Sequence, residues 1–212
     1  MKRPIIIIGA GGHSKVVLDT LQDMGEEIVG LVDNAKIEAG VSIQGYLVIG
    51  DDQTIESYAT NSIFLVNGVG SIRDTVNRKQ VYVKFTFHGY EFASVIHPTA
   101  IISKHAELGN GVQIMAGSVI QAEAHLGRNV IVNTGATVDH NCQIGDHCHI
   151  APGAVLSGNV DIGEDVHVGT GASIIQEVKI GAGATVAAGA TVIADVAAGT
   201  LVAGVPAREV RR

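Results

Sequence analysis

The segment Val132–His149, VNTGATVDHNCQIGDHCH, has an aliphatic residue at every sixth position. The same spacing runs without interruption from Ile102 to Val192, through sixteen consecutive hexads. Four positions after each aliphatic residue comes a small or medium residue, such as Ala136 or Cys142. A period of six fits neither an α-helix nor a heptad coiled coil and is typical of a parallel β-helix. We therefore expect coils of three hexads, or eighteen residues, with both columns inside.

Glycines mark every third hexad of this repeat, directly after the aliphatic residue: Gly109, Gly127, Gly145, Gly163 and Gly181. We interpret them as turn positions that need the backbone freedom of glycine.

The N-terminal half has a different pattern, which predicts an α/β domain. We expect strands at 4–8, 28–32, 63–66 and 92–96, and helices at 14–24 and 71–83. Strands alternating with helices through short links predict a small, Rossmann-like parallel sheet. All four tyrosines and four phenylalanines lie between positions 46 and 92, and the last 120 residues contain none. We therefore divide the chain into a domain at 1–95 and a β-helix domain at 96–212.

Composition excludes several classes of protein. The net charge of -7 argues against a nucleic-acid-binding surface. No apolar run approaches the ~18 residues of a membrane span, and the short run Ile5–Ile8 is too brief for a signal peptide. Two cysteines are too few for a disulfide scaffold. We expect a soluble, cytoplasmic protein.

A glycine-rich turn, Gly9-Ala10-Gly11-Gly12-His13, joins the first expected strand to the first helix. Glycines there let a ligand approach the backbone, and a helix N-terminus favours a phosphate. Asp33 ends the second strand, where an acid suits a ribose or a base edge. A nucleotide diphosphate is favoured over a merely structural turn. The dinucleotide motif is incomplete, because Ser14 stands at the position of its third glycine. NAD is disfavoured, because the expected sheet is too small for two mononucleotide halves and the chain offers no hydride chemistry.

His140 is the strongest candidate for catalysis. It lies at the third position of its hexad, which we expect at a corner of the coil, and Gly158 lies eighteen residues later in the same column. Neighbouring strands are ~4.8 Å apart, so a backbone N–H near Gly158 would lie beside the imidazole. A base next to an oxyanion donor is what acyl transfer requires. The alternative is a histidine that only forms hydrogen bonds between subunits.

The hexads resemble those of the hexapeptide acyltransferases, which are left-handed β-helices that work as trimers. Gly9–Lys15, Val66–Gly70 and Val95–Ala100 together resemble the sialic acid O-acetyltransferase family of sugar-nucleotide acetyltransferases. Its members include the UDP-linked bacillosamine-precursor and GDP-perosamine N-acetyltransferases. The resemblance covers nearly the whole chain. It implies a homotrimer with active sites between subunits, in which the small domain holds a sugar nucleotide and the coil holds acetyl-CoA.

The resemblance also implies roles for individual residues. It makes His140 the catalytic base, with Asn141 beside it and Gly158 as the oxyanion donor. Acetyl-CoA contacts carry over to Asn133, His149, Gly158, Thr170 and Ala188. Substrate contacts carry over to Gly9, Gly11, Gly12, His13, Asp33, Asn34, Asn67 and Gly68.

The function that we expect is direct transfer of acetyl from acetyl-CoA to the amine of a UDP- or GDP-linked 4-amino-deoxy sugar. No acyl-enzyme is expected, because Cys142 and Cys148 belong to the inner column and no Ser-His pair is evident. Three alternatives remain open. One is O-acetylation of a sugar hydroxyl, as on a sialic acid, and another is a non-catalytic trimeric scaffold that binds nucleotides. The third is a metal-dependent lyase on the same coil.

The remaining histidines are expected to be structural or solvated. His97 precedes a proline at the domain junction, and the corner residues His105, His125, His147 and His167 are expected to face water. Hexapeptide-coil carbonic anhydrases bind metal through histidines of which two are five residues apart. No pair here has that spacing, so no metal is expected.

Asn141 departs from the family pattern, which has an acidic residue after the catalytic histidine. An amide oxygen can accept the Nδ1–H of the imidazole but adds no charge, so Asp139 or Asp146 could substitute. From the sequence alone we expect Asn141→Asp to leave kcat unchanged or to raise it, as measured by CoA release. A clear loss would contradict this reasoning.

Overall fold

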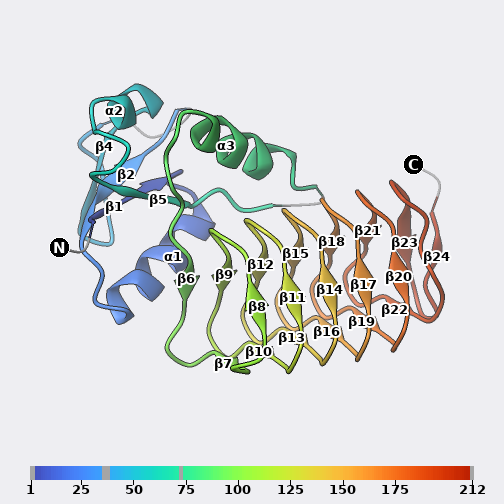
Figure 1. Cartoon of the computed structure of the whole chain (residues 1–212). Coiled ribbons are helices and arrows are strands. Elements are labelled where there is room, and N and C mark those ends of the chain that lie inside the picture. Colours follow the sequence, from blue (N-terminus) through green and yellow to red (C-terminus); the bar gives the residue numbers. More distant parts are fainter. Residues whose placement is uncertain (1–2, 35–38, 72–73, 211–212) are drawn as a thin grey trace. The chain divides into compact units, whose positions relative to one another are not determined.

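The structure is a computed structural model that describes residues 3–34, 39–71 and 74–210 (Figure 1). The chain divides into two compact units, Met1–Gly70 with Asn77–Pro98 and Ser71–Val76 with Thr99–Arg212. The sequence did not predict that the short segment 71–76 belongs to the second unit.

The first unit is built on a sheet of strand order β3-β4-β2-β1-β5. β1 pairs in parallel with β2 and β5, β2 pairs in parallel with β4, and β3 is antiparallel to β4. The bounds of the elements are β1 (Ile5–Ile8), α1 (Gly12–Asp23), β2 (Ile28–Val32), β3 (Ser42–Ile43), β4 (Tyr46–Gly50), α2 (Asp52–Glu56), β5 (Phe64–Asn67), α3 (Val76–Phe87) and β6 (Val95–Ile96).

Burial explains why the first unit folds this way. All four residues of β1 are buried, as expected for a central parallel strand that is covered on both faces. Four aromatic residues, Tyr82, Phe85, Tyr90 and Phe92, are buried in this core; the Tyr82 and Phe92 rings lie 4.7 Å apart, whereas Phe87 is exposed. β1, β2, β5 and α1 could therefore be predicted to within two residues, whereas β6 begins three residues later than the strand expected at 92–96.

Three elements of the first unit were missed. The hairpin β3–β4 and the short helix α2 fall where the sequence analysis expected no element. The helix expected at 71–83 is α3, which begins only at Val76, where the backbone N–H donates to Asp74 Oδ1 at 3.2 Å. The predicted parallel sheet is therefore a mixed sheet with an antiparallel edge.

The second unit is a parallel β-helix, which confirms the prediction from the hexads. Its strands form three rows. The first is the β7–β22 sheet, made of β7 (Ile101–Ile102), β10 (Val119–Ile120), β13 (Thr137–Val138), β16 (Val155–Leu156), β19 (Ser173–Ile174) and β22 (Thr191–Val192). The second is the β8–β20 sheet, made of β8 (Glu107–Leu108), β11 (His125–Leu126), β14 (Gln143–Ile144), β17 (Asp161–Ile162) and β20 (Lys179–Ile180).

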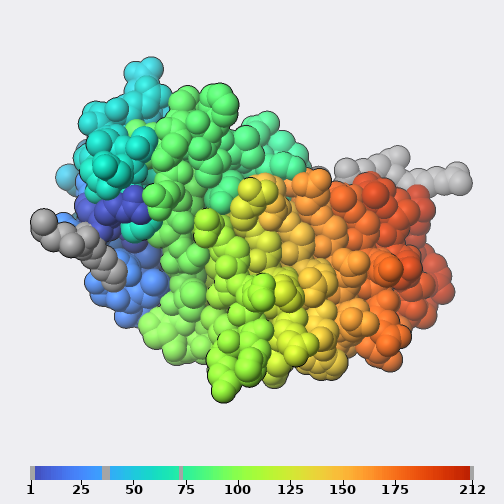
Figure 2. Space-filling model, in the orientation of Figure 1, coloured from blue at the N-terminus to red at the C-terminus, as the bar shows by residue number. Residues whose placement is uncertain are grey.

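The third row of this unit is the β9–β24 sheet. It contains β9 (Gln113–Ile114), β12 (Ile131–Val132), β15 (His149–Ile150), β18 (His167–Val168), β21 (Thr185–Val186), β23 (Leu201–Ala203) and β24 (Arg208–Glu209). β24 is antiparallel to β23 and closes the row. Figure 2 shows the successive coils as adjacent bands of colour from green to red.

The register of the stack is constant. Thr137 pairs with Val155, Gln143 with Asp161 and His149 with His167, so each residue lies beside the one eighteen positions later. The aliphatic and small columns are both inside; Val138, Cys142 and Ala154 are fully buried. Three corners join the rows. In the coil quoted above, the first corner is 133–136, the second is 139–142 and the third is 145–148.

The structure corrects the reason given for the regularly spaced glycines. Gly145 is absent from the residues with positive φ, so it does not serve a left-handed turn. A Cβ at Gly145 would lie 2.6 Å from the backbone nitrogen of Glu164 in the next coil, closer than real Cβ atoms come. These glycines therefore allow close approach of successive coils. The left-handed positions are other corner residues, such as Asn141 (φ 60) and Gly153 (φ +66).

This difference predicts that two glycine substitutions affect the free energy of unfolding to different extents. Gly145→Ala should lower the free energy of unfolding by about 2–3 kcal/mol, because the methyl group meets backbone that cannot move aside. Gly153→Asn should change it by less than about 1 kcal/mol, because asparagine tolerates the left-handed region and no atom lies within 4 Å of a Cβ at this position. Chemical denaturation measures both, and equal stability of the two variants would contradict this account.

Candidate active site

His140 lies at the second corner of the coil, as the sequence predicts, and its side chain is exposed. Two hydrogen bonds fix its backbone: the His140 N–H donates to Asp139 Oδ1 at 2.7 Å, and the His140 carbonyl accepts the Asn159 N–H at 2.8 Å. The Asn159 bond joins this residue to the next coil of the stack. The position of His140 is therefore set by the coil register.

The imidazole of His140 lies against Gly158. A Cβ built on Gly158 would lie 2.5 Å from His140 Nε2, so the ring in this orientation packs directly on the glycine. The neighbouring amides of Ser157 and Asn159 donate to Ile174 O and His140 O. Within the part of the chain that the structure describes, the Gly158 N–H has no backbone acceptor. The imidazole of His140 and the backbone of Gly158 are therefore adjacent.

The other imidazole nitrogen, Nδ1, is 2.9 Å from Asn141 Oδ1. An amide oxygen only accepts, so Nδ1 carries the proton and Nε2 is the basic nitrogen. The Asn141 Nδ2 group donates in turn to Glu123 Oε2 at 2.9 Å. The sequence analysis missed Glu123, although its position eighteen residues before Asn141 is a signal that could have found it.

The two carboxylates suggested from the sequence do not contact the imidazole. Asp139 Oδ1 accepts the backbone N–H of His140. Asp146 accepts from Arg128 Nη2 at 2.6 Å; burial acts to raise the pKa of Asp146, but the Arg128 hydrogen bonds lower it overall. The idea that either carboxylate substitutes beside the ring is wrong.

The residues that the resemblance assigns to acetyl-CoA lie elsewhere on the coil. Asn133, Thr170 and Ala188 belong to the first corner, where Thr170 and Ala188 are exposed. His149 faces outward from β15 but is only 6% exposed. Its Nδ1 is 2.5 Å from Ser71 Oγ and its Nε2 is 3.1 Å from Asn133 Nδ2. Gly158, by contrast, is at the second corner with His140.

The remaining histidines divide into exposed and buried ones. His105 is exposed, and His125 is half exposed with its Nδ1 3.1 Å from Glu107 Oε2. The expectation of solvated rings is wrong for His147, which is 6% exposed and 3.0 Å from Asn129 Nδ2. It is also wrong for His167, whose Nδ1 is buried and whose ring packs at 5.0 Å against that of His149; burial lowers the pKa of His167.

Both cysteines are core residues. Cys142 and Cys148 are fully buried, and burial raises the pKa of each thiol, to about 12 for Cys148. Since the thiolate is the reactive form, neither side chain is suited to act as a nucleophile.

In the first unit, the glycines of the turn differ in why the fold needs them. Gly9 has φ +97, which requires glycine. A Cβ at Gly68 would lie 2.5 Å from Ser14 Oγ, and this hydroxyl is 2.7 Å from Gly9 O. Gly11 and Gly12 have neither a positive φ nor any atom within 4 Å of a Cβ. The fold does not explain these two glycines, which face open space at the N-terminus of α1.

The other predicted substrate residues have different surroundings. Asp33 Oδ2 accepts the Ala10 N–H at 2.9 Å, so this acid lies at the turn. The His13 Cβ is 3.1 Å from the place of a Cβ on Gly70. Asn34 Oδ1 accepts the Asp52 N–H at 2.9 Å and thereby holds the start of α2.

Asn67 has a structural environment. It is 1% exposed, and its Nδ2 donates to Arg78 O at 2.9 Å. Arg78, which the sequence analysis missed, donates from Nη1 to Asn67 O at 2.8 Å and Val69 O at 2.9 Å. Burial lowers the pKa of Arg78 to about 9. These bonds fix the segment after β5 beside the turn.

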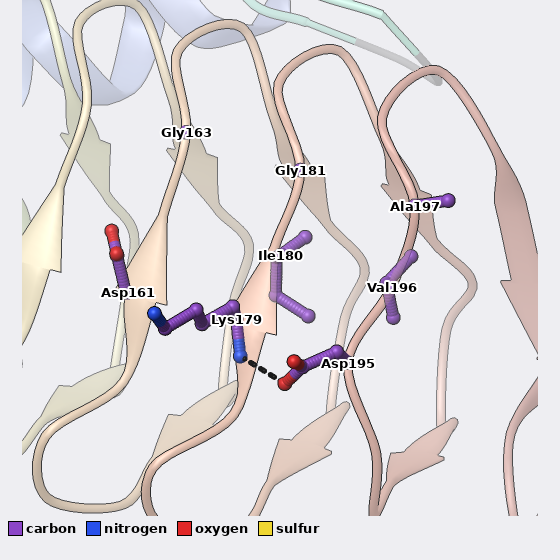
Figure 3. Close-up of a pocket in the computed structure, with 8 residues that line it drawn as sticks. All are labelled: Asp161, Gly163, Lys179, Ile180, Gly181, Asp195, Val196 and Ala197. Carbon is purple, nitrogen blue, oxygen red and sulfur yellow. Dashed lines mark hydrogen bonds between the residues drawn. The ribbon is translucent and has the colours of Figure 1, made fainter.

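Two surface hollows lie on the β8–β20 sheet, away from the predicted site residues. One, of 560 Å³, includes Asp161, Lys179 and Asp195; Figure 3 shows the Lys179 side chain extending toward Asp161, while its backbone N–H donates to Asp195 Oδ1 at 2.8 Å. The other, of 540 Å³, includes His125 and Asp146. Neither of these two hollows contains His140.

Two further searches cover only the described residues. They contain no group of three or more His, Cys, Asp or Glu side chains placed to hold a metal ion. None of their helices is long and apolar enough to cross a membrane.

Comparison with known proteins covers both units. Residues 4–85 match the PglD N-terminal domain, and residues 123–158 match the bacterial transferase hexapeptide, six repeats. PerB from Caulobacter crescentus, crystallised with CoA and GDP-perosamine, is 37% identical with a TM-score of 0.90, over 100% of this chain and 99% of that one. The acetyltransferase domain of PglB from Neisseria gonorrhoeae, crystallised with acetyl coenzyme A, is 37% identical with a TM-score of 0.90, over 99% and 100% of the chains.

A curated relative is more distant. The uncharacterized protein L142 of Acanthamoeba polyphaga mimivirus is 32% identical over 114 residues, which are 54% of this chain. The chain spans 23% of the length of that protein.

Proposed function

The chain belongs to the sugar N-acetyltransferases that join a PglD N-terminal domain to a hexapeptide-repeat β-helix, and we propose that it transfers acetyl from acetyl-CoA to the amine of a nucleotide-linked 4-amino sugar. The observation that carries the proposal is the contact of the His140 imidazole with Gly158. It supplies a base and an N–H donor at one point of the coil.

The proposed reaction needs no covalent enzyme intermediate. The unprotonated amine of the sugar attacks the thioester carbonyl, and His140 Nε2 accepts the proton that the nitrogen loses. The Gly158 N–H stabilises the oxyanion of the tetrahedral intermediate, which collapses as the C–S bond breaks and CoA leaves as the thiol once it is protonated. A positioned base contributes ~10²–10⁴ in rate, and an oxyanion donor ~10²–10³. The buried thiols support direct transfer.

The distribution of residues over the corners supports a homotrimer with sites between subunits. Asn133, Thr170 and Ala188 belong to the first corner and His140 to the second, on opposite sides of the β7–β22 sheet. A single chain does not bring these residues together. An adjacent copy that offers its first corner to His140 would do so, and light scattering tests the expected trimer mass.

Gly11 and Gly12, which face open space, support a phosphate site in the first unit. Gly11 precedes α1 and has no side chain to cap it, so the first N–H groups of the helix are available to a diphosphate. Asp33, held at the turn by Ala10, would bind the ribose or the base. The choice between UDP and GDP is open, and calorimetry with UDP- and GDP-linked 4-amino sugars decides it.

His140→Ala should lower kcat by about 10²–10⁴, because the variant has lost its general base. Sugar-nucleotide binding should stay within about twofold, since the nucleotide is assigned to the first unit. CoA release measures turnover, and mass spectrometry with a hydroxylamine test identifies an amide rather than an ester.

His125→Ala is the matched control, because His125 is a half-exposed histidine of the same β-helix outside the proposed site. It should keep full turnover. Near-normal kcat in His140→Ala would refute the proposed role, and a hydroxylamine-sensitive product would identify an O-acetyltransferase.

Gly12→Ala should separate folding from binding. The helical position favours alanine, so the free energy of unfolding should rise by up to about 1 kcal/mol. The KM for the sugar nucleotide should rise on the order of tenfold, because the methyl group occupies the space of the phosphate. Asp19→Ala, an exposed change on the same helix, serves as control. An unchanged KM in Gly12→Ala would contradict the proposal that a phosphate binds at this turn.

A further inference from the structure

The second corner holds a chain of three side chains that ends in a carboxylate. His140 Nδ1 is 2.9 Å from Asn141 Oδ1, and Asn141 Nδ2 is 2.9 Å from Glu123 Oε2. The residue directly after the histidine is an amide, and the carboxylate, Glu123, lies one coil earlier.

The coil register produces this arrangement. Glu123 and Asn141 are eighteen residues apart and both have φ 60, so they occupy equivalent left-handed positions of successive coils. The Asn141 N–H donates to Ala122 O at 3.1 Å, directly beside Glu123. The register thereby brings the Asn141 side chain within hydrogen-bonding distance of the Glu123 carboxylate.

The chemistry of the three groups fixes the direction of every proton. An ionised carboxylate can only accept, so Glu123 draws the NH₂ group of Asn141 toward itself. The amide oxygen must then face the ring, where it accepts the Nδ1–H. Nε2, the nitrogen against Gly158, is left unprotonated. Without Glu123 the amide could rotate by 180° and offer its NH₂ group to Nδ1, which would place the proton on Nε2.

We propose that Glu123 is a positioning residue that acts through Asn141 to hold His140 in the tautomer with a basic Nε2. The proposal rests on the proposed role of His140 as the base. Neither Asp139 nor Asp146 performs this task, because they bind the His140 N–H and Arg128.

Glu123→Ala should lower kcat by about tenfold, the lower end of losses seen when a partner of a functional histidine is removed. KM for both substrates should stay within about twofold, because Glu123 contacts neither in the proposal. Glu123→Gln should lose less, because its amide oxygen can still accept from Asn141. Glu177→Gln is the matched control: Glu177 is also an exposed, left-handed glutamate of this corner (φ 65), three coils further along, and it should keep full kcat.

Exchanging the two groups gives the sharpest test. Asn141→Asp alone sets two carboxylates in contact, which is unfavourable, so kcat should fall; this replaces the expectation drawn from the sequence alone. Adding Glu123→Gln restores one charge and one amide, with the Gln NH₂ donating to the new carboxylate. The double variant should recover kcat to within about threefold of the unmodified protein.

Nitrogen-15 NMR of labelled histidine reads the tautomer directly. The His140 signals, identified by their loss in His140→Ala, should report Nδ1–H in the unmodified protein and in the double variant, and a larger Nε2–H fraction in Glu123→Ala.

The outcomes separate this inference from the proposed function. Full kcat and an unchanged tautomer in Glu123→Ala, with His140→Ala inactive, would overturn the role of Glu123 alone. Full kcat in His140→Ala would overturn both. If Glu123→Ala fails to fold, Glu123→Gln and the double variant still decide: a double variant no more active than Asn141→Asp overturns the proposal.

Discussion

The constant register of the parallel backbone hydrogen bonds is the constraint on which the second unit depends. Because each coil has eighteen residues, position n always lies beside position n+18. The register accounts for the buried columns, the close-approach glycines and the contact of His140 with Gly158. A one-residue slip would turn inward side chains outward, and it would also separate His140, Asn141 and Glu123.

The sequence predicts this unit well because the information is local and repeated. Sixteen equally spaced aliphatic residues specify the strands, the register and the corners. The structural roles assigned to some individual residues were wrong. A glycine after a strand suggests a left-handed turn, whereas Gly145 is small because Glu164 of the next coil comes close. His147 looked solvated because its hexad position is a corner, but its ring bonds to Asn129 one coil earlier. Both contacts could have been found from residue numbers, because Glu164 lies nineteen residues after Gly145 and Asn129 lies eighteen residues before His147.

The first unit could be predicted only where its strands are apolar throughout. The hairpin β3–β4 is short, and its β3 strand carries an exposed Ser42, so no periodicity marks it. Its one local signal is the turn Gln44-Gly45, where both residues have positive φ. Arg78 could not have been found from the sequence, because it acts on the backbone of Asn67 and Val69 across a loop. Likewise, nothing local connects Ser71 with His149.

The exposure of the His140–Asn141–Glu123 chain limits what it can do in a single copy of the protein. All three side chains are exposed, and hydrogen bonds and charges at exposed positions are weakened by water. In the proposed trimer, both the hydrogen bonds and the charge interactions of these three side chains would be less exposed to water. A neighbouring first corner would bring the acetyl-CoA residues to the second corner and exclude water from the chain of hydrogen bonds. Assembly would then strengthen the restraint on the Asn141 amide where the thioester binds, so that the tautomer of His140 is held most firmly in the complete site.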